Sequence, residues 1–170
     1  AGHLWYLEHV LLFSLGYALW RRLRPGPAKS DPRGRPIPGP AVVVGLAVLI
    51  AVASALVRLA SPIDRWFNLL GFFKVAFADV PRDLAFFIVG LLAYPRDWFE
   101  RYSKRGGMVW LAVGLAGAAW WYAYDLGLHR WLPLPGTAFD VMYLLWEGLL
   151  CCGMCIGLLV LFRQVFRAPR

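Results

Sequence analysis

The feature that most constrains the fold is the run of apolar residues from 40 to 60, "PAVVVGLAVLIAVASALVRLA", in which Arg58 is the single charged residue. A helix of about 20 such residues is long enough to cross the hydrocarbon core of a bilayer. The rest of the chain has the same character, because 60% of its 170 residues are hydrophobic and its mean hydropathy is +0.57. One soluble core does not need so much apolar surface. The sequence therefore predicts a membrane protein whose main partner is the lipid bilayer.

Five segments have the length and composition of membrane spans. Nine tryptophans and seven tyrosines fit this class, because amphipathic rings favour the membrane interface. The predicted fold is an all-α, polytopic membrane protein with about five transmembrane helices. The predicted spans are 3–20, 40–60, 79–96, 108–125 and 139–162.

The segment 64–77, "DRWFNLLGFFKVAF", has sparse charges among aromatic and apolar residues. This composition predicts an interfacial amphipathic helix. The alternative is the beginning of one long span that is broken at Pro81, because proline removes a helix hydrogen bond and clashes with the preceding turn.

The distribution of Lys and Arg predicts the topology. The net charge is +8, and the basic residues lie in short connections between apolar runs, where they orient membrane helices. Segment 21–39 holds six basic residues and one acid, so it is predicted to be a cytoplasmic loop. Nucleic-acid binding is not expected, since topology explains these charges. Five spans then place Ala1 outside the cell without an initiator methionine or a signal segment. We therefore expect that a further part of the protein precedes this chain.

Four stretches resemble, in order, motifs of one protein family. "GHLWYLEHVLLFSLGYALWRR" resembles the "LWF-x-E-x-LLxFSxxYA" helix of the integral-membrane acyltransferases of the acyltransferase-3 family, which includes glucan succinyltransferases and sugar O-acetyltransferases. "VRLASPID" resembles the end of the next helix in that family. "LAFFIVGLLAYPRDWFER" resembles its "FFxxGxLAYRRxW", and "WEGLLCCGMCIGLLVLFRQVF" resembles its "WExxxCxGxxLGLLxLFRxxF". Together these motifs cover nearly all of the chain.

The resemblance implies a fold of about ten helices, of which residues 1–170 form one partial transmembrane domain. It implies transfer of an acetyl or succinyl group from cytoplasmic acyl-CoA, with no bound cofactor, to a hydroxyl of a cell-envelope carbohydrate. The implied location is the bacterial plasma membrane, with several spans. Family members carry near the N-terminus an arginine and, about ten residues later, a histidine that acts as the catalytic base. The sequence has no such pair, so its catalytic residue stays unassigned.

Several polar side chains lie where an apolar span is expected. Ionisable groups inside a membrane are costly, and they usually face a cavity or a partner. We interpret six residues as a possible polar lining, with water-exposed rim residues and helix–helix contacts as the alternatives. They are His3, Trp5, Glu8, His9, Arg58 and Glu147. Arg82 is a further candidate for holding an anionic group, although snorkelling to the interface explains such an arginine equally well.

The three cysteines of "CCGMC", residues 151–155, do not predict a metal centre. They lack a second Cys or His pair to complete four ligands, and buried thiols commonly behave as small apolar groups. The glycines at 148, 153 and 157 predict instead a close approach by another helix, and "GGMVW" and "GLAG" in the span 108–125 predict the same. The alternative function is a non-catalytic membrane protein, or half of a transporter or channel, that uses Glu8 and Glu147.

Overall fold

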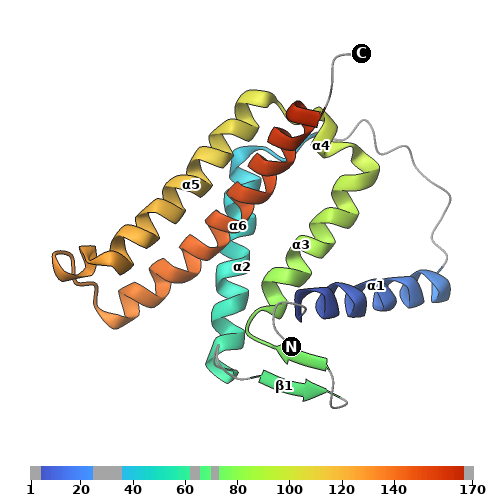
Figure 1. The fold of residues 1–170 in the computed structure, drawn as a ribbon. Helices are drawn as coiled ribbons and strands as arrows, with labels where there is room; N and C mark the ends of the chain where they lie inside the picture. Colours follow the sequence, from blue (N-terminus) through green and yellow to red (C-terminus); the bar gives the residue numbers. More distant parts are fainter. Residues whose placement is uncertain (1–4, 25–35, 62–65, 70–72, 167–170) are drawn as a thin grey trace. The chain divides into compact units, whose positions relative to one another are not determined.

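The computed structural model describes residues 5–24, 36–61, 66–69 and 73–166, and it is mostly helical (Figure 1). The chain forms two compact units. The first contains residues 1–35 and 53–96, and the second contains residues 36–52 and 97–170. Helix α2 (Pro40–Ala60) passes from the second unit into the first.

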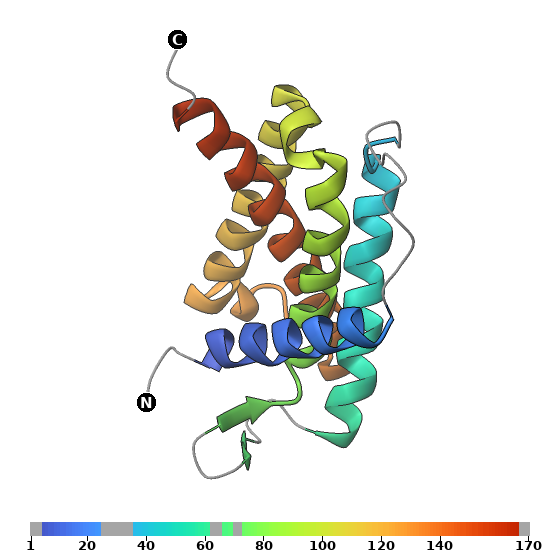
Figure 2. The ribbon, with the colours of Figure 1, turned by 90° about the vertical axis from the view of Figure 1, so that its right-hand side faces the viewer.

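In the first unit, helix α1 (Trp5–Leu23) contacts strand β2 (Phe73–Ala76) and helix α3 (Val80–Ala93), as Figure 2 shows. A short 3-10 turn, η2 (Tyr94–Arg96), follows α3. The predicted span 79–96 therefore contains a helix of 14 residues and a separate turn. Pro81 does not break a longer helix. It lies in the first turn of α3, where a proline costs no hydrogen bond.

The amphipathic helix predicted over 64–77 is wrong, because this segment contains a β-hairpin. Strand β1 (Trp66–Leu69) pairs antiparallel with strand β2 (Phe73–Ala76), and Trp66 lies opposite Ala76. Aromatic and β-branched residues fit a pleated strand. The intervening sequence "LGF" contains a glycine, a typical composition for a hairpin connection. These local preferences explain why the segment is not helical. Apart from these two short strands, the described part of the chain is helical, in agreement with the predicted all-α class.

In the second unit, helix α5 (Lys104–Leu126) and helix α6 (Gly136–Phe166) lie side by side. Ser103 caps the beginning of α5 by accepting a hydrogen bond from the backbone N–H of Gly106. Gly127, with φ +149°, ends it, and few residues other than glycine adopt such a conformation. The turn η3 (Leu128–Arg130) lies in the connection to α6. Helix α6 extends beyond the predicted span 139–162 at both ends.

Glycines allow the α5 and α6 backbones to touch, as the sequence predicted. A methyl group placed on Gly153 would lie 2.7 Å from the carbonyl oxygen of Trp110 and 2.9 Å from the backbone nitrogen of Gly114. One placed on Gly157 would lie 2.6 Å from the Cα of Leu111. Gly148 approaches the backbone of the first half of α2 in the same way, at 2.6 Å from the carbonyl oxygen of Ala47. The prediction of close helix approach at these glycines is confirmed.

The end of α6 is held to the short helix α4 (Trp98–Arg101) by one arginine. The guanidinium of Arg163 donates hydrogen bonds to the backbone carbonyls of Phe99, Glu100 and Tyr102. The last carbonyls of a helix have no partner within it, so the arginine supplies the missing donors.

Two helices of the described residues, α2 and α6, are long and apolar enough to cross a membrane. Helix α3 is too short for this criterion. Helices α1 and α5 are long enough to cross a membrane, but they do not combine high hydropathy with low charge as α2 and α6 do. Five membrane spans therefore stay a prediction.

Candidate functional site

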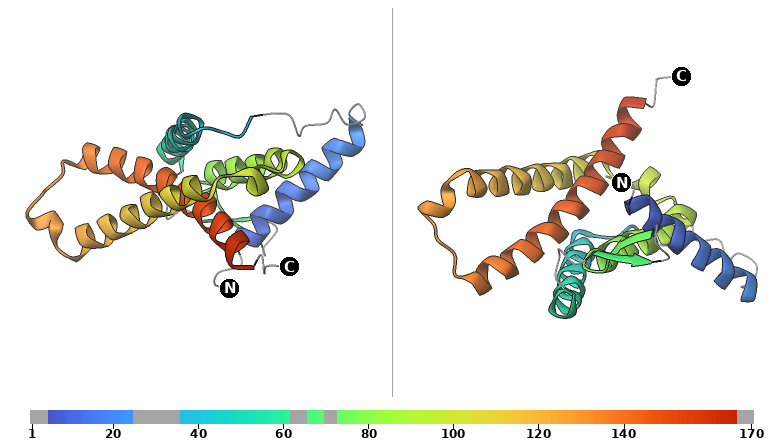
Figure 3. Two further views of the ribbon diagram at one scale, coloured as in Figure 1. Left: turned by 90° about the horizontal axis from the view of Figure 1, so that it is seen from above. Right: turned by 60° about the horizontal axis from the view of Figure 1, so that its bottom comes forward.

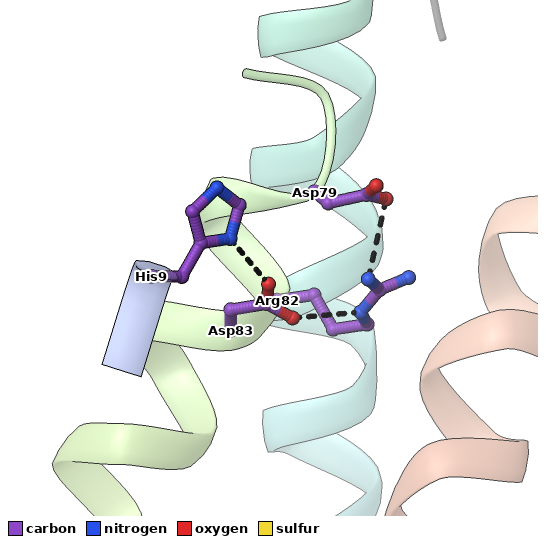
Figure 4. Close-up of polar contacts among 4 residues, drawn as sticks. All are labelled: His9, Asp79, Arg82 and Asp83. Atoms are coloured by element: carbon purple, nitrogen blue, oxygen red, sulfur yellow. Dashed lines mark hydrogen bonds and ion pairs between the residues drawn. The ribbon is translucent and has the colours of Figure 1, made fainter. Parts of the chain in front are cut away.

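A buried histidine and a buried aspartate meet where α1 crosses the beginning of α3. The Nδ1 atom of His9 lies 2.8 Å from Oδ2 of Asp83, although 74 positions separate the two residues in the chain (Figure 4). His9 is 1% exposed and Asp83 is 8% exposed. The pair is therefore shielded from water. In such a buried position, the electrostatic attraction between the two side chains is stronger than it would be at the surface.

Arg82 extends this contact into a chain of charged groups. Its Nε lies 3.2 Å from Oδ1 of Asp83, and its Nη2 lies 3.3 Å from Oδ1 of Asp79. Each carboxylate oxygen of Asp83 thus has a different partner, the imidazole or the guanidinium. We call His9, Asp79, Arg82 and Asp83 the His9 cluster.

The local sequence explains why three members of the cluster gather at one helix end. In "DVPRD", α3 begins at Val80, so Pro81 and Asp83 both lie in its first turn. A carboxylate is favourable there because the unpaired N–H groups carry partial positive charge. Asp79 is the N-cap residue, but its side chain makes no capping hydrogen bond. It contacts Arg82 instead.

Apolar rings pack beside the cluster and connect the same two helices. The ring of Phe13, one turn after His9 on α1, lies 6.1 Å from the His9 ring and 5.6 Å from the ring of Phe87 on α3. These tilted contacts have a geometry that aromatic pairs prefer. The imidazole therefore contacts the Asp83 carboxylate and the ring of Phe13.

The arrangement suits proton transfer. When an ionised carboxylate accepts a hydrogen bond from the Nδ1–H of a histidine, the lone pair of the ring lies on Nε2. The carboxylate also stabilises the imidazolium that forms when Nε2 takes up a proton, as in the serine hydrolase triads. A histidine held in this way is competent to deprotonate a hydroxyl group.

The shared polar lining predicted for six residues stays a prediction, and the structure describes the side chains of four of them, Glu8, His9, Arg58 and Glu147. His3 lies outside the described residues, and so does the side chain of Trp5, although its backbone begins α1. Glu8 is half-buried on α1 and Arg58 is half-buried near the end of α2. Glu147 is 8% exposed on α6 and belongs to the second unit. Of the six, only His9 belongs to the cluster.

Sequence reasoning missed Asp83 and Asp79. Both lie within three residues of Arg82. For Arg82 the sequence suggested binding of an anionic group or snorkelling, but not contact with these two acids. The available signal was the pair of acids around the first turn of an apolar helix, because a buried carboxylate in such a place requires a partner. Nothing in the sequence indicated that the partner would be His9.

Within the described ranges, no group of three or more His, Cys, Asp or Glu side chains is arranged to hold a metal ion. Cys151, Cys152 and Cys155 lie on α6 as reduced thiols. Comparisons of the chain with protein-family models, with curated proteins and with solved structures return no match. The function is therefore argued from the sequence motifs and from the geometry of the His9 cluster.

Proposed function

We propose that this chain is part of a multi-pass bacterial membrane acyltransferase that moves an acetyl or succinyl group from acyl-CoA to a hydroxyl of a cell-envelope carbohydrate. The observation that carries the proposal is the buried contact of His9 with Asp83, at 2.8 Å, because His9 lies on α1, the helix that bears the first family-like motif. Two helices able to cross a membrane support the location. The four ordered sequence motifs support the reaction class.

In the proposed reaction, Nε2 of His9 accepts the proton of the acceptor hydroxyl. The hydroxyl oxygen attacks the thioester carbonyl, the carbon–sulfur bond breaks, and the leaving thiolate takes the proton to become the free thiol of CoA. Asp83 stabilises the imidazolium between these steps, and Arg82 holds Asp83 in place. This scheme puts the base on α1. In the family that the chain resembles, the catalytic histidine instead follows an arginine by about ten residues, and this sequence has no such pair.

Two features of the chain bear on access to the reacting groups. Because His9 is 1% exposed, the residues that cover it must move to admit a hydroxyl. The basic residues of 21–35 and 96–105 lie in predicted cytoplasmic segments, where they are available to the phosphates of CoA. In this scheme the donor approaches from the cytoplasm, and the acceptor approaches from the other side.

The test measures release of CoA thiol by membranes that contain the protein, with acetyl-CoA or succinyl-CoA and with or without a glucan acceptor. We expect acceptor-dependent release that falls about 10²–10⁴-fold in His9→Gln, the usual contribution of a general base. Asp83→Asn should also lower the rate. His129→Gln is the matched control, because His129 contacts the Tyr124 carbonyl in the other unit. A full rate in His9→Gln would show that His9 is not the base. Absence of acceptor-dependent release with both donors would refute the acyltransferase proposal.

A second candidate, passage of protons or cations, is favoured by one observation. Glu147 is 8% exposed in the middle of α6, a helix apolar enough to cross a membrane, and buried acids in such helices commonly mark ion paths. Vesicles that contain the protein would then dissipate an imposed pH or cation gradient, and Glu147→Gln would stop this flux. Equal flux in vesicles with and without the protein would exclude this function.

A further inference from the structure

The two halves of α1 differ in how far the first unit covers them. The first half holds the buried His9 and the half-buried Phe13 against α3. Every residue from Ser14 to Arg24 is exposed, and Figure 3 shows this half extending away from α3. We call residues 14–24 the α1 arm.

The α1 arm has an apolar face and a basic face. At about 100° per residue, Leu15, Leu19 and Leu23 fall within a sector of about 80° on the helix. They are 59%, 59% and 72% exposed. Arg21 and Arg24 lie on the opposite side of the helix. A leucine face opposite a basic face is the pattern of helices that lie in a membrane interface.

The charges of the arm call for an anionic partner. It carries Arg21, Arg22 and Arg24 but no acidic residue. Among the described residues, none of these three arginines forms an ion pair. Guanidinium groups bind phosphate oxygens strongly. Trp20, which is 53% exposed on the same arm, is of a type that favours the boundary between acyl chains and headgroups.

The direction of α1 fits the plane of a membrane better than a span. Helix α2 is apolar enough to cross a membrane, whereas α1 does not meet the same criterion. In Figures 1 and 2, α1 runs across the direction of α3 and of residues 53–60 of α2, which belong to the same unit. If α2 crosses the bilayer, α1 therefore runs along its surface.

A bilayer with anionic lipids matches both faces of the arm, because phosphates lie directly above its acyl layer. A second copy of the arm does not match, since it carries the same arginines and no acid. Like charges that face each other across an interface are unfavourable. The charge pattern thus selects the lipid surface over a second copy.

We propose that the α1 arm lies in the interface of an anionic bilayer and does not cross it. The three leucines enter the upper part of the acyl layer, and the three arginines contact lipid phosphates. The inference rests on the membrane location in the proposed function, but not on the chemistry of His9. It replaces the predicted span 3–20 with a surface helix, and it places the His9 cluster near the membrane surface.

The experiment measures the depth of the arm in vesicles of phosphatidylglycerol and phosphatidylcholine. A nitroxide is attached to Leu15→Cys, Leu19→Cys or Leu23→Cys in the whole chain, with the native cysteines replaced by alanine. Depth follows from the ratio of collisions with oxygen and with a water-soluble nickel chelate. We expect one common depth, about 5–10 Å into the boundary between headgroups and acyl chains. A spanning helix would separate the first and last labels by about 12 Å in depth.

Labels on α2 distinguish failure of the inference from failure of the proposed function. Val44→Cys and Leu56→Cys replace exposed residues, and they are about 18 Å apart along the helix. If these two labels show no difference in depth, α2 does not cross the bilayer, and the membrane location is wrong. If they do differ and the α1 labels also differ by about 12 Å, only the inference is wrong.

Removal of the arginines tests the charged face. An arginine near an anionic surface contributes about a fivefold preference, so Arg21→Gln/Arg22→Gln/Arg24→Gln should lower the membrane-bound fraction of the arm relative to the detached fraction about 100-fold. The Leu19 label would then collide with the nickel chelate. The matched control, Lys104→Gln/Arg105→Gln/Arg130→Gln, removes three exposed charges elsewhere and should leave the depth unchanged.

Three other results would overturn the inference, and each identifies a different partner. Exclusion of both oxygen and nickel at all three labels would show that another protein segment covers the leucines. Magnetic broadening between labels of different copies would show that the arm pairs with a second copy. Displacement of the Leu19 label by excess CoA would show that the arginines bind CoA phosphates in place of lipid.

Discussion

The contact between α1 and α3 and the contact between α5 and α6 hold helices together by opposite means. The first depends on a buried polar pair, His9 and Asp83, with few neighbouring ring contacts. The second depends on glycines that bring two backbones together, with a side-chain hydrogen bond from Trp146. The polar contact therefore provides directional specificity, and the glycine contact provides close packing.

If the proposed membrane location is correct, this difference illustrates two ways in which helices join in a bilayer. Burying apolar side chains gives little advantage in a bilayer, because the lipid tails are as apolar as leucine. Helices then associate through close packing of small residues or through hydrogen bonds. The chain uses each solution in a different unit. The polar solution leaves chemically reactive groups at the contact.

The largest effect is expected from removing one member of the polar pair. In His9→Leu, Asp83 keeps Arg82 but loses its imidazole partner in a buried position. An unsatisfied buried acceptor costs about 1–3 kcal/mol and more when it is charged, so we expect a loss of about 3 kcal/mol in the free energy of unfolding. The measurement is a denaturant titration in mixed micelles, followed by circular dichroism.

The double variant His9→Leu/Asp83→Leu tests whether the pair itself is responsible. Replacing both members of a buried polar pair with apolar residues is often nearly neutral. Arg82 would keep Asp79 and remains 18% exposed to solvent. We therefore expect the double variant to be more stable than His9→Leu. If His9→Leu and the double variant are equally unstable, His9 contributes through packing. The contrast between the α1–α3 contact and the α5–α6 contact then disappears.

A smaller effect is expected at the glycine contact. Gly153→Ala puts a methyl group 2.7 Å from a backbone carbonyl, which cannot move without shifting α5. Overpacking of this kind costs about 1–3 kcal/mol, and the better helix propensity of alanine returns up to about 1 kcal/mol. We expect a net loss of about 2 kcal/mol in the same titration.

Gly117→Ala is the matched control on the facing helix. Its methyl group meets Trp146 at 3.6 Å, so helix propensity should dominate and the chain should be unchanged or slightly more stable. If Gly153→Ala and Gly117→Ala behave alike, backbone contact is not what joins α5 to α6. The description of this contact as glycine-dependent would then be wrong.

The helices and the glycine contact could be predicted because both depend on local sequence features, namely apolar runs and the spacing of small residues. The run 40–60 coincides with α2 (Pro40–Ala60), and 108–125 lies within α5 (Lys104–Leu126). The small residues at 153 and 157 mark the contact face of α6 at helical spacing. These features require no knowledge of which segments meet in space.

The hairpin and the His9 cluster could not be predicted, for different reasons. The hairpin segment is apolar and aromatic, and its composition suits both an interfacial helix and a strand. The cluster depends on a contact between residues 74 positions apart. A single sequence identifies two polar groups that need partners, but it does not pair them. The site therefore emerges only when α1 and α3 are placed together.

The smallest effect is expected from the Trp146 hydrogen bond across the α5–α6 contact. Trp146→Phe removes the Nε1–H that reaches the Gly117 carbonyl, while a ring remains to stack near Trp121. Hydrogen bonds between membrane helices average about 0.6 kcal/mol, and the smaller ring loses some packing, so we expect a loss of about 1 kcal/mol. Trp120→Phe, at an exposed neighbouring position, should lose less. A loss as large as that of His9→Leu would mean that this contact also depends on a polar link, because backbone packing around Gly153 is unchanged in the variant.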